Sequence, residues 1–368
     1  MEMNLEVFKN PQLAKSLLES IAAAKVGDVN LMEVCGTHTM AIARGGLRSV
    51  LPPNVHLLSG PGCPVCVTCN RDIDTVIALA KMPQVTITTF GDMIRVPGST
   101  TTLQKEKAAG ADVRVVYSPL DALRIAQSEP AREVVFVGVG FETTAPLVAA
   151  TIRRAKEQGI GNFSVACAHK NVPHVLEVLV NDPEVAIDAF ILPGHVSTII
   201  GTRPYAFLAE KYGIPGVVTG FETVDVLEGI AMLVRQLEQK AAGDAHAAKI
   251  EIAYARGTQS EGNPTAVAAI EEVFEECDAE WRGLGTIPRS GFRIRSEYSQ
   301  FDAIAKFSPE PEPTKEPRGC RCADILRGVL RPSQCPLFEK VCTPQSPVGP
   351  CMVSSEGSCA AFYKYQIK

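Results

Sequence analysis

Residues 134–139, Val-Val-Phe-Val-Gly-Val, run directly into Gly140-Phe141-Glu142-Thr143 and then into a helical pattern over residues 145–157. A continuous apolar run of this length is typical of a parallel strand that is covered on both faces. The glycine provides the bend, and the Glu and Thr suit the first turn of a helix. The stretch therefore predicts a strand–turn–helix unit of a layered α/β fold.

The same unit recurs along the first 240 residues, and Gly220-Phe221-Glu222-Thr223 repeats the turn itself. For this second copy, helix capping and a functional role stay open; for the first copy, the additional Thr144 favours function. Strands are predicted at 30–34, 55–58, 85–89, 113–116, 134–139, 163–168, 189–192 and 216–219, and helices at 71–80, 119–127, 145–157 and 224–241. Eight such strands predict two similar parallel-sheet, Rossmann-like domains that face a cleft.

The pattern changes after residue 244. One further strand is predicted at 250–254 and a helix at 264–277, followed by a Pro/Glu-rich connector at 308–317 and a tail rich in cysteine. The tail has few apolar runs, so we expect a small, mostly helical or irregular domain that a metal group orders. We predict three segments: 1–128 and 129–243, each an α/β domain, and 244–368, an iron–sulfur domain.

Composition and charge exclude several functions. The net charge is −5, the pI is about 5.8, and no run of Lys and Arg indicates a nucleic-acid partner. The N-terminus lacks the basic and apolar regions of a signal peptide, and no apolar run reaches the roughly 18–20 residues that span a bilayer. We expect a soluble, cytoplasmic monomer, in which the 12 cysteines serve metal or redox chemistry rather than structural disulfides.

Ten of these cysteines form two groups at opposite ends of the chain. In the first group, Cys35 ends a predicted strand beside His38, at an edge where α/β sheets bind ligands. A helix N-terminus there would lower the pKa of the Cys35 thiol. Cys63-x-x-Cys66 and Cys66-x-x-Cys69 have the spacing of redox or metal sites, so Cys35, Cys63 and Cys66 are candidate metal ligands.

Other predicted strand ends carry polar groups toward the same cleft. Glu142, Thr143 and Thr144 follow one strand, and His195 follows another as a candidate proton or hydrogen-bond donor. Cys167 and His169 lie at the end of a third, where a structural role is equally compatible with the sequence. A dinucleotide site is rejected, because the turn after residue 139 lacks the third glycine and the acidic residue about 20 positions later.

The second cysteine group lies in the tail. Cys320, Cys335, Cys342 and Cys359 are widely and unevenly spaced, with Cys322 and Cys351 between them. This spacing suits a [4Fe–4S] cluster held from separate turns, whereas structural zinc usually shows CxxC pairs. Zinc stays an alternative, and the spacing does not decide between Cys320 and Cys322.

These motifs together resemble the HypD family of [NiFe]-hydrogenase maturation proteins, from about Glu33 to the C-terminus. The matching stretches are Cys35-Gly-Thr-His38-Thr39, Gly60-Pro-Gly-Cys63-Pro-Val-Cys66, Gly140-Phe-Glu-Thr-Thr144, Pro193-Gly-His195-Val-Ser197 and Gly349-Pro-Cys351-Met-Val-Ser-Ser-Glu-Gly-Ser-Cys359. The resemblance implies two α/β domains around a cleft and a third with a [4Fe–4S] cluster. It also implies assembly of the Fe(CN)2CO group with two partners, HypC, which holds iron, and HypE, which supplies cyanide.

By the same resemblance, Cys35 binds the iron, and Cys63 and Cys66 are the redox pair. Cys69 stands where the family pattern has proline, and it could compete with Cys63 for Cys66. We hypothesise that the cluster reduces Cys63–Cys66, and that His38, Glu142, Thr143, Thr144 and His195 line the cleft around cyanide. On this reading the chain is a redox-active assembly scaffold rather than a stand-alone enzyme. The alternatives are a free-standing thiol–disulfide oxidoreductase and a zinc-stabilised binding protein.

Overall fold

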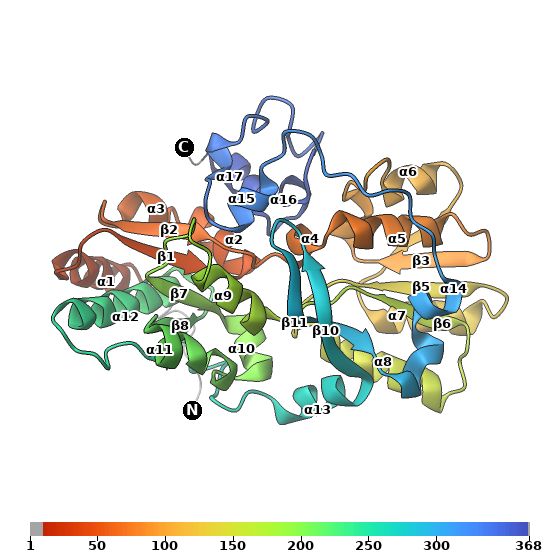
Figure 1. Cartoon of the computed structure of the whole chain (residues 1–368), viewed down its shortest axis with the longest axis horizontal. Helices are drawn as coiled ribbons and strands as arrows, with labels where there is room; N and C mark the ends of the chain where they lie inside the picture. Colours follow the sequence, from red (N-terminus) through yellow and green to blue (C-terminus); the bar gives the residue numbers. More distant parts are fainter. Residues whose placement is uncertain (1–9, 367–368) are drawn as a thin grey trace.

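The parallel strands form two separate sheets in the computed structural model, which describes residues 10–366 (Figure 1). The first sheet has the order β2-β1-β7-β8-β9, and the second has the order β4-β3-β5-β6. Their strands are β1 (Val29–Glu33), β2 (Val55–Ser59), β3 (Val85–Thr89), β4 (Asp112–Val115), β5 (Glu133–Gly138), β6 (Phe163–Cys167), β7 (Ala189–Pro193), β8 (Gly216–Thr219) and β9 (Ile250–Ile252). Every neighbouring pair is parallel, which confirms the predicted α/β fold class.

Helices cover the sheets, with α12 packed on β7 and β8 and α7 packed on β5. They are α1 (Pro11–Ala23), α2 (Gly36–Arg44), α3 (Leu47–Val50), α4 (Pro64–Val67), α5 (Asn70–Ala80), α6 (Leu103–Ala108), α7 (Pro119–Ser128), α8 (Ala145–Glu157), α9 (Val172–Val180), α10 (Gly194–Ile200), α11 (Ala206–Tyr212) and α12 (Thr223–Ala241). Short 3₁₀ helices span Gly91–Arg95, Arg203–Tyr205, Ser296–Phe301 and Pro332–Gln334.

Local sequence explains where several helices begin. Asn10 precedes α1, and its side chain accepts the N–H groups of Gln12 and Leu13. Ser118 caps α7 and Asn263 caps α13 (Pro264–Val273) in the same way, each directly before a proline. A capping side chain followed by proline is a favourable helix start, because proline needs no hydrogen-bond acceptor at that position.

The sheets are assembled differently from the predicted division at residues 128/129. That division falls between β4 and β5, and both strands belong to the second sheet. The chain leaves the first sheet after β2 and returns at β7, where Leu31 of β1 pairs with Ala189. β9 extends the first sheet beyond residue 243. Apolar strands that are covered on both faces carry no local sign of which strand they will pair with, so sequence order misplaced the boundary.

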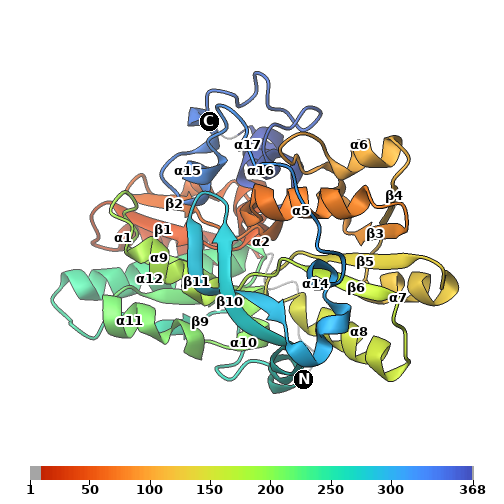
Figure 2. The same cartoon turned by 45° about the vertical axis from the view of Figure 1, so that its right-hand side comes forward.

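The predicted helix at 264–277 is wrong in its last part. α13 ends at Val273, and β10 (Phe274–Trp281) then pairs antiparallel with β11 (Gly285–Ile294). Phe274 and Trp281, at the two ends of β10, are buried. Between them, half-buried residues such as Glu275 and Cys277 alternate with exposed ones. An acidic run suits an exposed helix or an exposed strand, and pairing with β11 decided between them. Figures 1 and 2 show this hairpin between the two sheets.

The tail lies beside the junction of the two sheets (Figure 2). The connector at 308–317 contains no helix or strand, as predicted. It is flanked by α14 (Ala303–Phe307) and followed by α15 (Cys322–Leu326), α16 (Pro350–Val353) and α17 (Ser358–Tyr365). One buried apolar cluster contains tail cysteines together with Cys63, Cys66 and Trp281. The tail therefore shares a hydrophobic core with the first sheet and the helices that cover it.

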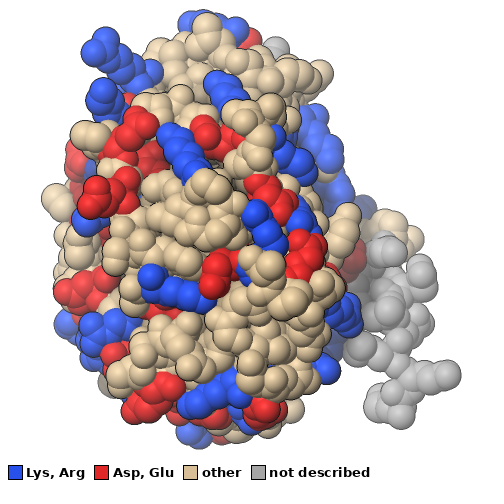
Figure 3. Space-filling view, turned by 90° about the vertical axis from the view of Figure 1, so that its right-hand side faces the viewer, with Lys and Arg blue, Asp and Glu red and all other residues tan. Residues whose placement is uncertain are grey.

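The surface carries charges of both signs. On the face shown in Figure 3, Lys and Arg side chains are interspersed with Asp and Glu. Within residues 10–366, no helix has both the length and the apolar character needed to cross a membrane.

Candidate functional site

A cleft of about 510 Å³ lies where the carboxyl ends of strands from both sheets meet. This is the edge at which α/β sheets bind ligands. The lining residues come from the turns after β1, β2, β5, β7 and β9 and from the tail: Cys35, Thr37, Gly62, Pro64, Phe141, Thr143, Thr144, His195, Val196, Thr198, Ile199, Tyr254, Gly257 and Glu356. The fold therefore brings together Cys35, Thr143, Thr144 and His195, four of the residues that the sequence predicted.

Cys35 stands at the junction of β1 and α2, where it is the N-cap residue of the helix. Burial raises the pKa of its thiol to about 12, and the Glu356 carboxylate adds to the rise. The backbone N–H groups of His38 and Thr37 offset this only in part. The expected lowering of the pKa by the helix N-terminus is therefore wrong, because desolvation outweighs the helix end.

Two carboxylates that the sequence analysis missed adjoin Cys35. Glu33 is fully buried, accepts the Cys35 N–H at 3.1 Å and accepts the Thr39 hydroxyl at 2.6 Å. Burial raises the pKa of Glu33 to about 7. Glu356 comes from the tail, and its carboxylate accepts the Thr37 hydroxyl at 2.7 Å. The sequence does contain a signal for Glu33, because a charged residue inside the otherwise apolar strand predicted at 30–34 is unusual.

The two predicted histidines occupy different positions. His195 lines the cleft, whereas His38 is fully buried and is not part of the lining. The Nε2 atom of His38 lies 3.0 Å from the Gly220 carbonyl oxygen and 2.8 Å from the Thr219 hydroxyl. Burial lowers the pKa of His38 to about 4. Phe221 stacks on both imidazoles, at 4.8 Å from His38 and 3.9 Å from His195. His38 therefore packs against Phe221, which in turn packs on His195 and holds it at the cleft.

The turn after β5 divides its polar residues in a similar way. Thr143 and Thr144 line the cleft, whereas Glu142 points into the core behind it. One carboxylate oxygen of Glu142 accepts the Val172 N–H at 3.0 Å, and the other has no hydrogen-bond partner within residues 10–366. Burial raises the pKa of Glu142 to about 7. The expectation that Glu142 lines the cleft is wrong.

The repeated turn after β8 has a capping role. Glu222 is the N-cap residue of α12 and forms a reciprocal capping box with Asp225. Asp225 also pairs with Arg256 in a largely buried position. Capping of α12 is therefore sufficient to explain this second copy of the turn.

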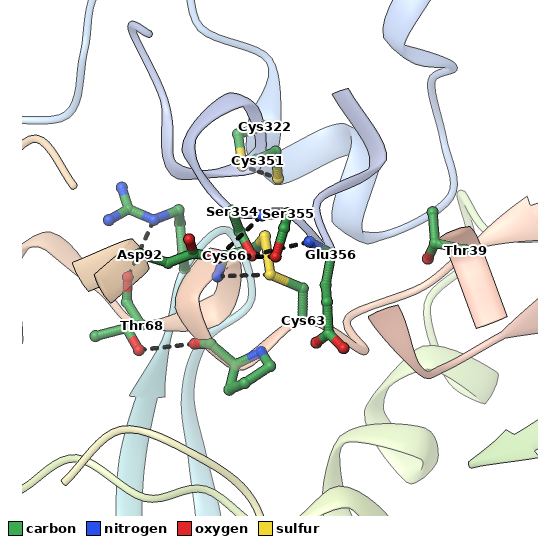
Figure 4. The surroundings of a disulfide bond; sticks show 12 residues. Thr39, Cys63, Cys66, Thr68, Asp92, Cys322, Cys351, Ser354, Ser355 and Glu356 are labelled. Atoms are coloured by element: carbon green, nitrogen blue, oxygen red, sulfur yellow. Dashed lines mark hydrogen bonds between the residues drawn. A yellow bond between two sulfur atoms is a disulfide. The ribbon is translucent and has the colours of Figure 1, made fainter. Parts of the chain in front are cut away.

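Cys63 and Cys66 form a disulfide at the two ends of a short turn (Figure 4). α4 begins directly after Cys63, and the Cys66 N–H lies 3.2 Å from the Cys63 sulfur. Both sulfur-bearing residues are buried, at 4% and 0% exposure, although Pro64 between them lines the cleft. Cys69 is unpaired and buried at the start of α5, and burial raises its pKa to about 12. The pairing question that Cys69 raised is thus answered in favour of Cys63–Cys66.

The tail cysteines converge on one apolar cavity. All six line it, together with side chains such as Phe338 and Met352: Cys320, Cys322, Cys335, Cys342, Cys351 and Cys359. The Cys322 and Cys351 sulfurs are 2.7 Å apart. Soft thiolates in an apolar setting are the donor set of an iron–sulfur cluster, so the residues present fit a four-cysteine cluster. Within residues 10–366, no three His, Cys, Asp or Glu side chains are arranged to hold a single metal ion.

The disulfide and the tail are in direct contact. α4 packs against α15 and α16, the helices that carry Cys322 and Cys351 (Figure 4). The tail also contacts the 3₁₀ helix that follows β3 of the second sheet, where Asp92 accepts the Ser355 N–H at 3.0 Å. The tail thus contacts the disulfide turn, the cleft and the α/β units built on both sheets.

The remaining sequence candidates lie away from the cleft. Cys167 donates to the Phe292 carbonyl at 3.1 Å, and its sulfur is 3.4 Å from the Nδ1 atom of His169. Burial lowers the pKa of His169 to about 3 and raises that of Cys167 to about 12. Both residues pack beneath β11, where they anchor the hairpin to β6.

The fold and the site define a class: a two-sheet α/β protein with a buried thiol in its cleft and a disulfide backed by a cavity lined with cysteines. Comparison with known proteins then identifies the family. The HypD family model, described as "Hydrogenase formation hypA family", matches residues 12–366. The chain belongs to this family.

Close relatives carry the corresponding names. A hydrogenase maturation factor HypD from Rhodobacter capsulatus is 47% identical over 370 residues, which cover 97% of each chain. One from Escherichia coli (strain K12) is 48% identical over 339 residues, covering 92% of this chain and 89% of the relative. One from Rhizobium leguminosarum bv. viciae is 46% identical over 371 residues, covering 98% and 95%.

Proposed function

We propose that this chain is a hydrogenase maturation factor, a scaffold and redox component on which the Fe(CN)2CO group is assembled. The observation that carries the proposal is the placement of Cys35 in a cleft beside the Cys63–Cys66 disulfide, which itself packs on the cavity lined with cysteines. Family membership supports the same role.

Cys35 is the proposed ligand of the iron, which is the cargo of the reaction. Its thiol must lose a proton when iron binds, because the thiolate is the ligand form. The threonine hydroxyls of Thr143 and Thr144 and the imidazole of His195 line the same cleft. The Thr143 hydroxyl and the His195 imidazole can donate hydrogen bonds to cyanide nitrogens, whereas the Thr144 hydroxyl already donates to the Phe141 carbonyl at 3.2 Å. His38 and Glu142 are buried behind the lining of the cleft.

The tail cysteines would hold a [4Fe–4S] cluster, which when bound supplies electrons one at a time. The Cys63–Cys66 pair stores two electrons as a dithiol. Its sulfurs are buried against α15 and α16, which favours exchange of electrons within the molecule.

The proposed partners are a HypC-type chaperone that shares the iron and a HypE-type protein that supplies cyanide. Both rest on the family.

Infrared and Mössbauer spectroscopy test this function on protein purified anaerobically, alone and with HypC. We expect separate signals for a four-iron cluster and for a low-spin iron with cyanide and CO bands. Cys35→Ala should abolish those bands while the cluster signal stays. Cys277→Ala, on the hairpin away from the cleft, is the matched control and should keep both. Undiminished bands in Cys35→Ala would overturn the assignment.

A free-standing thiol–disulfide oxidoreductase is the second candidate. The buried position of both disulfide sulfurs disfavours it, because a protein substrate could not approach them in this conformation. Turnover of a protein disulfide without iron or HypC would favour this second function instead.

A further inference from the structure

A second pocket, of about 310 Å³, lies at the outer edge of the first sheet, where the edge strand β2 adjoins the tail (Figure 1). The residues that line this edge pocket come from α3, from β2 and the turn before it, and from the tail: Arg48, Leu51, Pro52, Pro53, Val55, His56, Leu57, Arg331 and Phe362. None of these nine residues lines the cleft around Cys35, so the two cavities are separate. The volume is at the lower end of the range for ligand pockets and suits a small molecule.

The edge pocket carries an excess of positive charge. Its ionisable side chains are two arginines and a histidine, and among the described residues the lining contains no Asp or Glu. Asp28 lies outside the lining, with its Oδ1 atom 3.4 Å from the Nε2 atom of His56, and it is 83% exposed, so water screens its charge. Arg331 is exposed and forms no ion pair with another residue in the range 10–366. The pocket therefore presents cationic groups without a carboxylate among them.

Arg48 is fixed at the wall of the edge pocket. Its Nη1 atom donates to the Leu57 carbonyl, and its Nη2 atom donates to the Ser59 hydroxyl at 3.3 Å. The guanidinium also lies 5.4 Å from the centre of the Phe362 ring. Because a guanidinium has five N–H donors, these two hydrogen bonds orient Arg48 and leave donors for a ligand.

Arg331 brings a second guanidinium to the same pocket. It is the N-cap residue of the 3₁₀ helix Pro332–Gln334, which packs against α17. Burial lowers the pKa of Arg48 to about 10; the charge of Glu33 opposes this fall, whereas the charge of Arg331 adds to it. The two cations therefore repel each other, and an anion bound between them would relieve the repulsion. Arginine side chains bind carboxylate and phosphate groups through paired hydrogen bonds.

The rest of the wall is apolar. Leu51, Val55 and Leu57 are buried there, beside the two prolines and the Phe362 ring. Apolar walls with a few charged groups are typical of pockets for organic ligands. A bare inorganic ion would leave this wall in water, whereas an anion with an apolar body would cover it.

We propose that the edge pocket binds a small organic anion, with its carboxylate or phosphate group between Arg48 and Arg331 and its apolar body against the remaining wall. The imidazole of His56 offers a further hydrogen-bond donor from the same lining. The inference rests on this pocket alone and is independent of the proposed function.

Calorimetric titration of the intact, anaerobically purified protein at low ionic strength tests the proposal. The probes are phenyl phosphate and benzoate, and neutral benzamide is the matched control ligand. At least one of the two anions should bind with a Kd of about 1 mM or lower, and the tighter one identifies the charged group. Benzamide should bind at least about tenfold more weakly, because it lacks the charge. Binding of neither anion, or equal binding of benzamide, would overturn the inference.

A pair of arginine variants then tests the site. Arg331→Gln removes an exposed guanidinium from the lining and should weaken binding of the tighter anion at least about tenfold. Arg318→Gln removes an exposed arginine of the tail that does not line the pocket, and it should leave the affinity unchanged. Equal losses in the two variants would indicate general attraction to a cationic surface and would contradict the proposed site.

A second measurement uses the parent protein and so does not depend on the folding of a variant. Phenylglyoxal modifies accessible arginines, and mass spectrometry follows the modification of each one. The tighter anion, at about ten times its Kd, should slow the modification of Arg331 about tenfold and leave that of Arg318 unchanged. Binding of the anion without protection of Arg331 would place it elsewhere and refute the proposal.

Discussion

At Cys35, two opposing effects act on one thiol. The N-terminus of α2 favours the thiolate, and such a helix end is worth about 0.3–1 kcal/mol. Burial favours the neutral thiol and raises its pKa from 9.0 to about 12, which corresponds to roughly 4 kcal/mol. Desolvation decides the outcome. The free site is therefore a protonated thiol that becomes a ligand only when a cation replaces the proton.

Glu142 gives a pH prediction. Burial raises its pKa from 4.5 to about 7, so the folded state binds its proton more tightly than the unfolded state does. The stabilisation from this protonated carboxyl is present below pH 4.5 and is lost as the pH rises to about 7. Glu142→Gln removes this loss. Relative to the variant, the parent protein should lose on the order of 3 kcal/mol of unfolding free energy over that interval.

Urea unfolding at pH 4.5 and pH 7.5 measures this difference. Glu310→Gln, on the exposed connector, controls for the loss of a carboxylate in general. A difference between parent and Glu142→Gln that is the same at both pH values would contradict the prediction.

At the scale of elements, the hairpin is the feature that links the two sulfur sites. β10 and β11 extend between the two sheets, and their tip contacts both α4 and α15 (Figure 2). Two glycines at this tip have positive φ, but only Gly283 faces another element; Gly285, with a φ of +72°, has nothing within 4 Å of its would-be Cβ. Alanine at Gly285 would therefore carry only the cost of a positive φ, whereas alanine at Gly283 would also clash with α15.

Gly283→Ala should therefore destabilise the protein more than Gly285→Ala. Both variants carry the cost of an alanine at positive φ, on the order of 1 kcal/mol. Gly283→Ala adds a clash with Ala323, at about 1–3 kcal/mol. Chemical unfolding of the two variants checks the prediction. Equal stabilities would show that the tip can move away from α15 at no cost.

At the scale of the whole molecule, the tail connects parts that the chain order separates. Its six cysteines line one cavity, Glu356 accepts the Thr37 hydroxyl, and Ser355 donates to Asp92 in the 3₁₀ helix that follows β3. A cavity lined by unligated thiols is a weak centre for a small domain, and bound metal groups commonly supply the missing stability. The order of the tail should therefore depend on the proposed cluster.

Removal of iron by an anaerobic chelator should accelerate cleavage at the connector. A glutamate-specific protease can act at Glu310, Glu312 and Glu316, and ligand loss raises the population of the open tail. We expect cleavage to be at least about tenfold faster in the chelated protein, while the α/β bodies stay intact. Mass spectrometry of the fragments follows both. Identical rates with and without iron would show that the tail is ordered by its apolar contacts alone.

Local pattern predicted much of this protein. The sequence marked all nine strands of the two sheets, eight of them to within one residue at each end, and the ninth, predicted at 250–254, begins as predicted and ends at Ile252. Continuous apolar segments between helices have few alternatives to a parallel strand. The motif Gly-Pro-Gly-Cys63-Pro-Val-Cys66 indicated a shaped loop with the spacing of a redox or metal site, and the repeated turn after β5 and β8 predicted two helix starts. The β10–β11 hairpin was not predicted, because its acidic residues, such as Glu275 and Glu276, are compatible with an exposed helix or an exposed strand.

The sequence by itself determined the α/β class, the two groups of clustered cysteines and the family, because these depend on local runs and motifs. Only the tertiary structure decided which strands share a sheet, which polar residues reach the cleft and which stay behind it. It also raised the pKa of Cys35 and brought Glu33 and Glu356 close to that thiol. Pairing, burial and desolvation are properties of neighbours distant in the chain, and no local pattern records them.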